Sequence, residues 1–108
     1  MPAMATNRLE ILKQMLLENP KNTFARYGLA MEYAKNGDYN EAIAEFRTLL
    51  RDDENYVAAY FHAGQTYEKL SEIEEARAIY EKGIEVATHK GDTHTRSEIE
   101  AALSLLPV

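Results

Sequence analysis

Apolar side chains recur every three to four residues in six stretches of the chain, and short polar segments separate these stretches. In the first stretch, Leu9, Leu12, Met15 and Leu16 fall on one side of a helix, and the others repeat this spacing. Asn, Gly and Pro mark the segments between them, where helices end. The pattern therefore predicts an all-α chain without strands, with helices at about residues 7–18, 24–36, 39–51, 57–70, 73–88 and 95–106.

The residues at the predicted helix ends indicate how each helix starts and stops. Thr6 and Thr23 are expected to be N-caps, because a hydroxyl can accept a hydrogen bond from a free N–H of the first turn. Gly37 tolerates the positive φ that often follows a helix. Pro20 and Pro107 cannot continue one. The opening residues 1–4 are expected to be disordered.

One part of the chain is repeated. Gly37–Phe46 is echoed by Ser71–Tyr80, and each copy combines a turn, a helix start, a small residue and an aromatic residue one turn later. A shift of 34 residues lays segment 23–56 over segment 57–90, and it also lays residues 9–20 over residues 43–54. The matched pairs of the two full segments are Ala25/Ala59, Tyr27/Phe61, Ala30/Gly64, Tyr33/Tyr67, Lys35/Lys69, Glu41/Glu75, Ala42/Ala76, Phe46/Tyr80 and Leu50/Ile84.

A period of about 34 residues with two helices per unit is typical of tetratricopeptide repeats, and the chain resembles that family. Ala30 and Gly64 would let helices approach closely, while Tyr33 and Tyr67 would fill the space between layers. The resemblance implies a right-handed α-solenoid of antiparallel helix pairs. It divides one domain, residues 1–108, into an N-terminal half-repeat helix (7–22), two repeats (23–56 and 57–90) and a capping helix (93–106) with a polar outer face.

A few positions depart from the family's pattern. Arg26 stands where the family prefers a large apolar residue, and Ala63 is smaller than the usual leucine. Arg8 replaces the alanine expected in the first helix, and Glu54 and Thr88 replace the proline that closes a repeat. The resemblance nevertheless covers nearly the whole chain.

The charge and composition narrow the possible functions. The chain has 108 residues and a net charge of −6, which opposes non-specific binding to nucleic acid or to anionic lipid. It has no cysteine, so disulfides and thiolate chemistry are excluded. No segment approaches the roughly 18 apolar residues of a membrane span, and no signal peptide is recognisable. These features favour a cytoplasmic protein without a nucleic-acid or membrane partner.

In the family, the first helix of each repeat lines a concave groove that receives a peptide or a partner's helix. Phe24, Tyr27 and Met31 form an apolar stripe beyond what the core needs, which is typical of a binding surface. Alternatively, the N-terminal helix folds against this stripe, or the rings pack along the groove floor. The groove residues that the resemblance implies are Phe24, Tyr27, Met31, Lys35, Phe61, His62, Gln65 and Lys69.

Some family members hold a C-terminal carboxylate of a chaperone with a clamp of Lys and Asn. The matching positions here hold Tyr27, Met31, Phe61 and Gln65, so this ligand is not expected. Lys35 and Lys69 either meet an acidic side chain of a partner or are solvated helix ends.

Candidate catalytic and metal sites have no support in the sequence. His89 and His94 lack the spacing of a helical metal pair, and the acidic run 52–54 lacks the glycine of a calcium loop. We therefore expect a non-enzymatic protein-interaction module without a metal or cofactor. The alternatives are a structural subunit that assembles weakly with itself or within a larger complex through a helix face, and, less favoured, a small metal-dependent enzyme.

Overall fold

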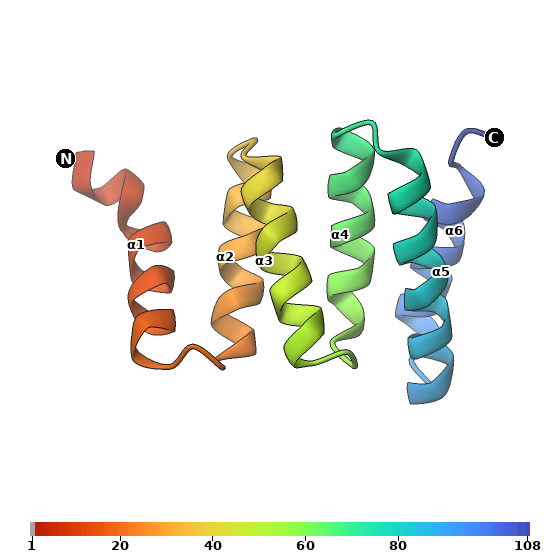
Figure 1. The fold of residues 1–108 in the computed structure, drawn as a ribbon, viewed down its shortest axis with the longest axis horizontal. Helices are drawn as coiled ribbons and strands as arrows, with labels where there is room; N and C mark the ends of the chain where they lie inside the picture. The colour runs from red at the N-terminus through yellow and green to blue at the C-terminus, as the bar shows by residue number, and fades with distance from the viewer. Residues whose placement is uncertain (1) are drawn as a thin grey trace.

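The computed structural model describes residues 2–108 and contains six helices within them. They follow one another across the molecule in chain order (Figure 1), and the whole measures 44 × 27 × 20 Å. The all-α prediction is confirmed, and the architecture is a solenoid of antiparallel helix pairs. The helices are α1 (Pro2–Glu18), α2 (Thr23–Lys35), α3 (Tyr39–Asp52), α4 (Val57–Lys69), α5 (Ile73–Lys90) and α6 (Thr93–Ser104).

The N-terminal end of the first helix differs from the prediction. Helix α1 begins at Pro2, so Thr6 lies inside it and is not a cap, and residues 2–4 are helical where disorder was expected. Proline fits the first turn of a helix because the N–H it lacks would have no intrahelical partner there. Met1 lies outside the described residues.

The other helix ends agree with the prediction or differ from it by one or two residues. Asn22 rather than Thr23 caps α2, because the Asn22 side chain accepts a hydrogen bond of 3.0 Å from the Ala25 N–H. Helix α5 extends to Lys90, and Asp92 caps α6 by accepting from the Thr95 N–H at 3.0 Å. Although α6 ends at Ser104, Leu106 beyond it is still buried, so the predicted apolar stripe holds past the helix end.

Three consecutive clusters of apolar side chains make up the core. Leu12, Ala25 and Leu29 join α1 to α2, a second cluster around Phe46 joins α2, α3 and α4, and a third around Tyr80 and Ile99 joins α4, α5 and α6. The aromatic residues predicted to lie between layers, Tyr33 and Tyr67, are partly buried against these clusters. Each helix thus packs on its neighbours in the stack, as in a repeat protein.

The charged residue at an expected apolar position has an ionic partner. Arg26 of α2 makes a 2.5 Å contact to the Glu45 carboxylate of α3, and both side chains are largely covered. Arg26 also donates a hydrogen bond of 3.1 Å to the Pro20 carbonyl. The pair links the first two helices of a repeat at a point where the second repeat has Tyr60 and Ile79.

None of the helices within residues 2–108 is both long and apolar enough to cross a membrane.

Candidate functional site

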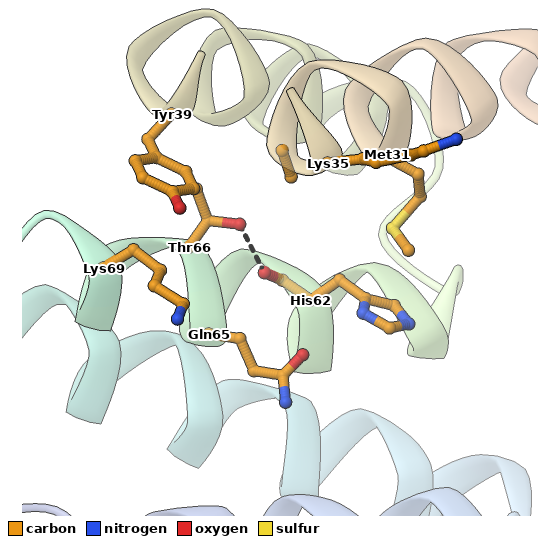
Figure 2. Close-up of a pocket in the computed structure, with 8 residues that line it drawn as sticks. Met31, Lys35, Tyr39, His62, Gln65, Thr66 and Lys69 are labelled. Atoms are coloured by element: carbon orange, nitrogen blue, oxygen red, sulfur yellow. Dashed lines mark hydrogen bonds between the residues drawn. The ribbon is translucent and has the colours of Figure 1, made fainter. Parts of the chain in front are cut away.

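The first helices of the two repeats, α2 and α4, border a small pocket of about 240 Å³, which we call the α2–α4 groove (Figure 2). Helix α2 and the start of α3 supply one wall and α4 supplies the other. Five of the eight predicted groove residues meet here, namely Met31, Lys35, His62, Gln65 and Lys69. Ala34, Tyr39 and Thr66 complete the lining.

The centre of this groove is mostly apolar. Figure 2 shows the Met31 side chain of α2 extending toward the His62 ring of α4. The Thr66 hydroxyl donates a hydrogen bond of 2.8 Å to the His62 carbonyl, one turn back on α4, and is therefore already satisfied. Gln65 is exposed beside them, so its amide is positioned to donate to and accept from a bound backbone.

His62 is a neutral residue of the groove wall at pH 7. Its ring lies 5.2 Å from the Phe61 ring and 5.9 Å from the Tyr27 ring, both in edge-on geometry. Burial lowers the pKa of His62 below its usual value of 6.5, and a hydrogen bond with Gln65 and the negative charge of Glu98 offset this only in part. The imidazole therefore contributes an apolar face and one hydrogen-bond donor rather than a charge.

The charge of the α2–α4 groove is positive, although the chain as a whole is acidic. None of its eight lining residues, all of them described, is a carboxylate, whereas two are lysines. The Lys35 ammonium is largely exposed, 4.0 Å from a Glu32 carboxylate that Arg8 also contacts at 2.9 Å. The nearest acid on α4, Glu68, accepts a hydrogen bond of 2.5 Å from the Tyr80 hydroxyl.

Two of the predicted groove residues serve mainly in packing. Tyr27 is partly buried, with its ring 5.0 Å from that of Tyr56 and 6.4 Å from that of Phe46, and desolvation raises its pKa. Phe61 packs against the C-terminal cluster. Neither residue is among those that line the α2–α4 groove.

The remaining aromatic residue of the predicted groove, Phe24, faces a different cavity. Phe24 is 73% exposed and, with Tyr27, Gly28 and Met31 of α2, lines one side of an apolar opening of about 760 Å³. Arg8, Ile11, Leu12 and Met15 of α1 line its other side. We call this opening the α1–α2 slot. Helix α1 therefore does not cover the stripe; it forms the facing wall of a larger site.

Sequence reasoning did not identify the α1 residues of this slot. The sequence did contain a signal for them. The 34-residue shift aligns α1 with α3, the second helix of a repeat, and no segment of this sequence aligns with α2 ahead of α1.

Among residues 2–108 no group of three His, Cys, Asp or Glu side chains is arranged to hold a metal ion. His94 is exposed and lies 3.8 Å from Glu98 of its own helix, at the spacing of an ordinary surface pair.

The sequence is similar to proteins of one repeat family. Residues 27–88 match the family model for the tetratricopeptide repeat. A curated mouse relative, tetratricopeptide repeat protein 12, is 35% identical over 57 residues, which are 53% of this chain and 8% of the relative. The match thus spans less than a tenth of that relative's length.

Solved structures share the fold. A tetratricopeptide repeat domain protein from Salinibacter ruber is 38% identical, with a TM-score of 0.74 over 79% of this chain and 86% of that one. The TPR2B domain of yeast Sti1, solved as a pHsp70 complex, is 19% identical, with a TM-score of 0.84 over 89% of this chain and 77% of that one. The period, the helix pairs and these similarities lead to one conclusion: the chain belongs to the tetratricopeptide repeat family.

Proposed function

We propose that this chain is a non-enzymatic protein-interaction module that binds an acidic peptide segment of a partner protein in the α2–α4 groove. The observation that carries the proposal is that Lys35 and Lys69 both line a pocket whose centre is apolar and whose lining includes no carboxylate. Met31 would contact an apolar side chain of the peptide, Gln65 its backbone, and the two lysines its acidic groups.

The size of the groove favours a peptide over a cofactor. A volume of about 240 Å³ is smaller than the roughly 300–1,000 Å³ of typical small-molecule sites. An extended peptide needs only shallow pockets for alternate side chains and obtains the rest of its contacts along the surface. Because two repeats offer a short groove, we expect a dissociation constant on the order of 10 µM.

The related structures agree with peptide binding in general but not with one particular ligand. The yeast Sti1 domain was solved as a pHsp70 complex. This chain carries Tyr27, Met31, Phe61 and Gln65 where the chaperone-binding members have their carboxylate clamp, and two of these side chains are committed to packing. A groove with two lysines and an apolar centre therefore suits an acidic segment within a partner's chain better than a peptide held by its C-terminal carboxylate.

The test begins with a partner captured on the purified chain from an extract of its native cell. The double variant Lys35→Glu/Lys69→Glu is compared with Arg51→Glu/Lys82→Glu, which makes the same charge change on α3 and α5, away from the groove. Circular dichroism checks that both variants are folded.

We expect the groove variant to bind the partner at least about tenfold more weakly, because two attractive contacts become repulsive, and the control to change by about twofold or less. Equal losses in both variants would mean that only the net charge matters, and unchanged binding in the groove variant would place the partner elsewhere. Either result would overturn the proposal.

A further inference from the structure

The α1–α2 slot lies where the repeat pattern would place a first helix against α1. In the full repeats, the second helices α3 and α5 carry Phe46 and Tyr80, which are fully buried beneath the first helices α2 and α4. The 34-residue shift gives α1 the same role as α3 and α5, with Leu12 at the position of Phe46. Within residues 2–108 no helix lies on α1 as α2 lies on α3.

The side chain of Ile11 marks where a first helix would contact α1. The 34-residue shift makes Ile11 equivalent to Glu45 and to Ile79. Glu45 is covered by Arg26 of α2, and Ile79 is partly buried between α4 and its neighbours. Ile11 itself is 56% exposed. It is therefore an apolar residue at a position that a first helix covers in both complete repeats, and burying it would be favourable.

The α2 side of the slot has the same character. Phe24 and Ile11 belong to the few large apolar side chains that are exposed, and they face the same opening. The approach of α1 to α2 is close at Gly28, where an added Cβ would lie 3.1 Å from Leu12 Cδ2. Leu12 and Gly28 thus pack together at the bottom of the slot, while Ile11 and Phe24 on its two sides remain exposed to solvent. This arrangement suits the binding of one further helix.

Helix α6 of a second copy of the chain is not suited to bind in the α1–α2 slot. If the solenoid stacked head to tail, the free face of α6 would have to pack on α1. When α2, α4 and α6 are aligned at their N-caps (Asn22, Tyr56 and Asp92), Glu100 of α6 falls at the position of Ala30 and Gly64, which are small. Glu100 forms an ion pair of 3.2 Å with Arg96. A charged pair at the point of closest helix contact blocks that approach and must stay hydrated.

The distribution of charge indicates what kind of helix would bind. Residues 1–35, which include both walls of the slot, carry five basic and three acidic side chains, whereas residues 36–108 carry seven basic and fifteen acidic ones. Arg8 lies in the lining and is mostly exposed. Arg8 is the one charged residue among those that line the slot, and it also contacts Glu32 at 2.9 Å. An occupant with an acidic outer face therefore suits the slot better than one with a basic outer face.

From these observations we propose that the α1–α2 slot binds an amphipathic, acidic α-helix of a partner protein, which lies on α1 and α2 in the position that a first helix takes in the two complete repeats. This site is separate from the α2–α4 groove and does not depend on its function. Met31 lines both openings, whereas Tyr27 lines only the slot.

The probe is a pair of synthetic peptides that copy the apolar face of α4, the first helix of a full repeat. Both carry Val, Tyr, Ala, Gly and Tyr at the spacing of residues 57, 60, 63, 64 and 67 and a hydrocarbon staple, because a short isolated helix is marginal in water. Their outer positions are Glu in one peptide and Lys in the other. Amide NMR shifts of the whole chain locate binding, and calorimetry measures the dissociation constant.

The expected result is a set of shifts centred on Ile11, Met15, Phe24 and Gly28, with the Glu peptide binding about fivefold more tightly than the Lys peptide at low salt. Ile11→Glu should weaken the Glu peptide at least about tenfold, whereas the control Leu105→Glu should not, since Leu105 is 84% exposed at the other end of the molecule. Gln65→Ala/Lys69→Glu, which alters only the α2–α4 groove, should leave slot binding unchanged.

Three results would overturn the proposal. The peptides bind nowhere on the chain; their shifts centre on α4 and Lys69 instead of on α1; or the free chain forms a dimer that Ile11→Glu dissociates and the peptides do not displace, which would make a second copy the occupant. Loss of groove binding in the Lys35→Glu/Lys69→Glu variant bears on the proposed function alone.

Discussion

At the scale of single residues, Gly64 of α4 lies directly against the ring of Tyr80 of α5. A Cβ at position 64 would lie 2.1 Å from Tyr80 Cε1 and 2.5 Å from two further ring atoms. The ring cannot move aside easily, because it is fully buried and its hydroxyl is bonded to Glu68. Burial, followed by the hydrogen bond and charge of Glu68, raises the pKa of Tyr80 well above its ordinary range, so the hydroxyl stays protonated and donates.

Gly64 and Gly28 should therefore respond differently to substitution by alanine. Gly64→Ala should lower the free energy of unfolding by about 1–3 kcal/mol, because it overpacks a site with no free space. Gly28→Ala meets only the flexible end of Leu12, at 3.1 Å, and alanine favours a helix by up to about 1 kcal/mol over glycine. Urea denaturation of both variants checks this, and equal destabilisation would contradict it.

A second residue-scale feature explains a departure from the family's pattern. Arg26 replaces an apolar residue, and it is tolerated because Glu45 and the Pro20 carbonyl take up its guanidinium. The pair is cross-helix and largely covered from solvent, so removing one partner alone leaves a poorly solvated charge. Arg26 and Glu45 therefore depend on each other, although they lie far apart in the sequence.

At the scale of the helices, three of the six end in the same way. After α2, α4 and α5 the chain passes through a positive φ at Gly37 (84°), Ser71 (59°) and Gly91 (71°). In each case the next N–H donates back to a carbonyl of the last helical turn, for example from Asp38 to Tyr33 at 2.9 Å. This is the Schellman ending, in which glycine is favoured because it lacks a Cβ.

Ser71 is the residue that fits this ending least well. Ser71→Gly should raise the free energy of unfolding by about 0.5–1 kcal/mol, since a residue with a side chain is strained at positive φ. The matched change Gly37→Ser should lower it by a similar amount, because nothing lies within 4 Å of the added Cβ and only the backbone is affected. Thermal unfolding measures both, and shifts of the same sign would refute the argument.

At the scale of the whole molecule, stability is built from neighbouring contacts. Helix α1 packs on α2 alone, whereas α4 contacts helices on both sides. The N-terminal cluster of three buried residues is also smaller than the C-terminal cluster of eight. In repeat proteins, segments with fewer contacts open at lower free energy than the rest.

Two core truncations at opposite ends should therefore have local effects. Leu12→Ala and Ile99→Ala each remove a buried side chain, at a cost of about 2–5 kcal/mol. Hydrogen exchange should show faster amide exchange in α1 for Leu12→Ala, with α4–α6 unchanged, and faster exchange in α4–α6 for Ile99→Ala. If both variants accelerate exchange evenly along the chain, the molecule unfolds as a single unit and this account is wrong.

The sequence by itself determined the fold. The spacing of apolar residues places six helices, and the 34-residue repeat of Ala30/Gly64, Ala42/Ala76 and Phe46/Tyr80 places them in pairs, because these signals depend on residues close in the chain. The ends of helices were predicted less well at Pro2 and Asn22. Whether a helix extends by another turn depends on small differences in capping free energy.

Only the tertiary structure decided which side chains are free to bind. Tyr27, Phe24 and Met31 look equivalent on one helical face, yet packing with Tyr56 takes up Tyr27, and the absence of a helix over α1 leaves Phe24 open. Both outcomes depend on neighbours that lie elsewhere in the chain. A helical pattern reports which face of a helix is apolar, but burial depends on what packs against that face, and here a whole helix position is vacant within the described chain.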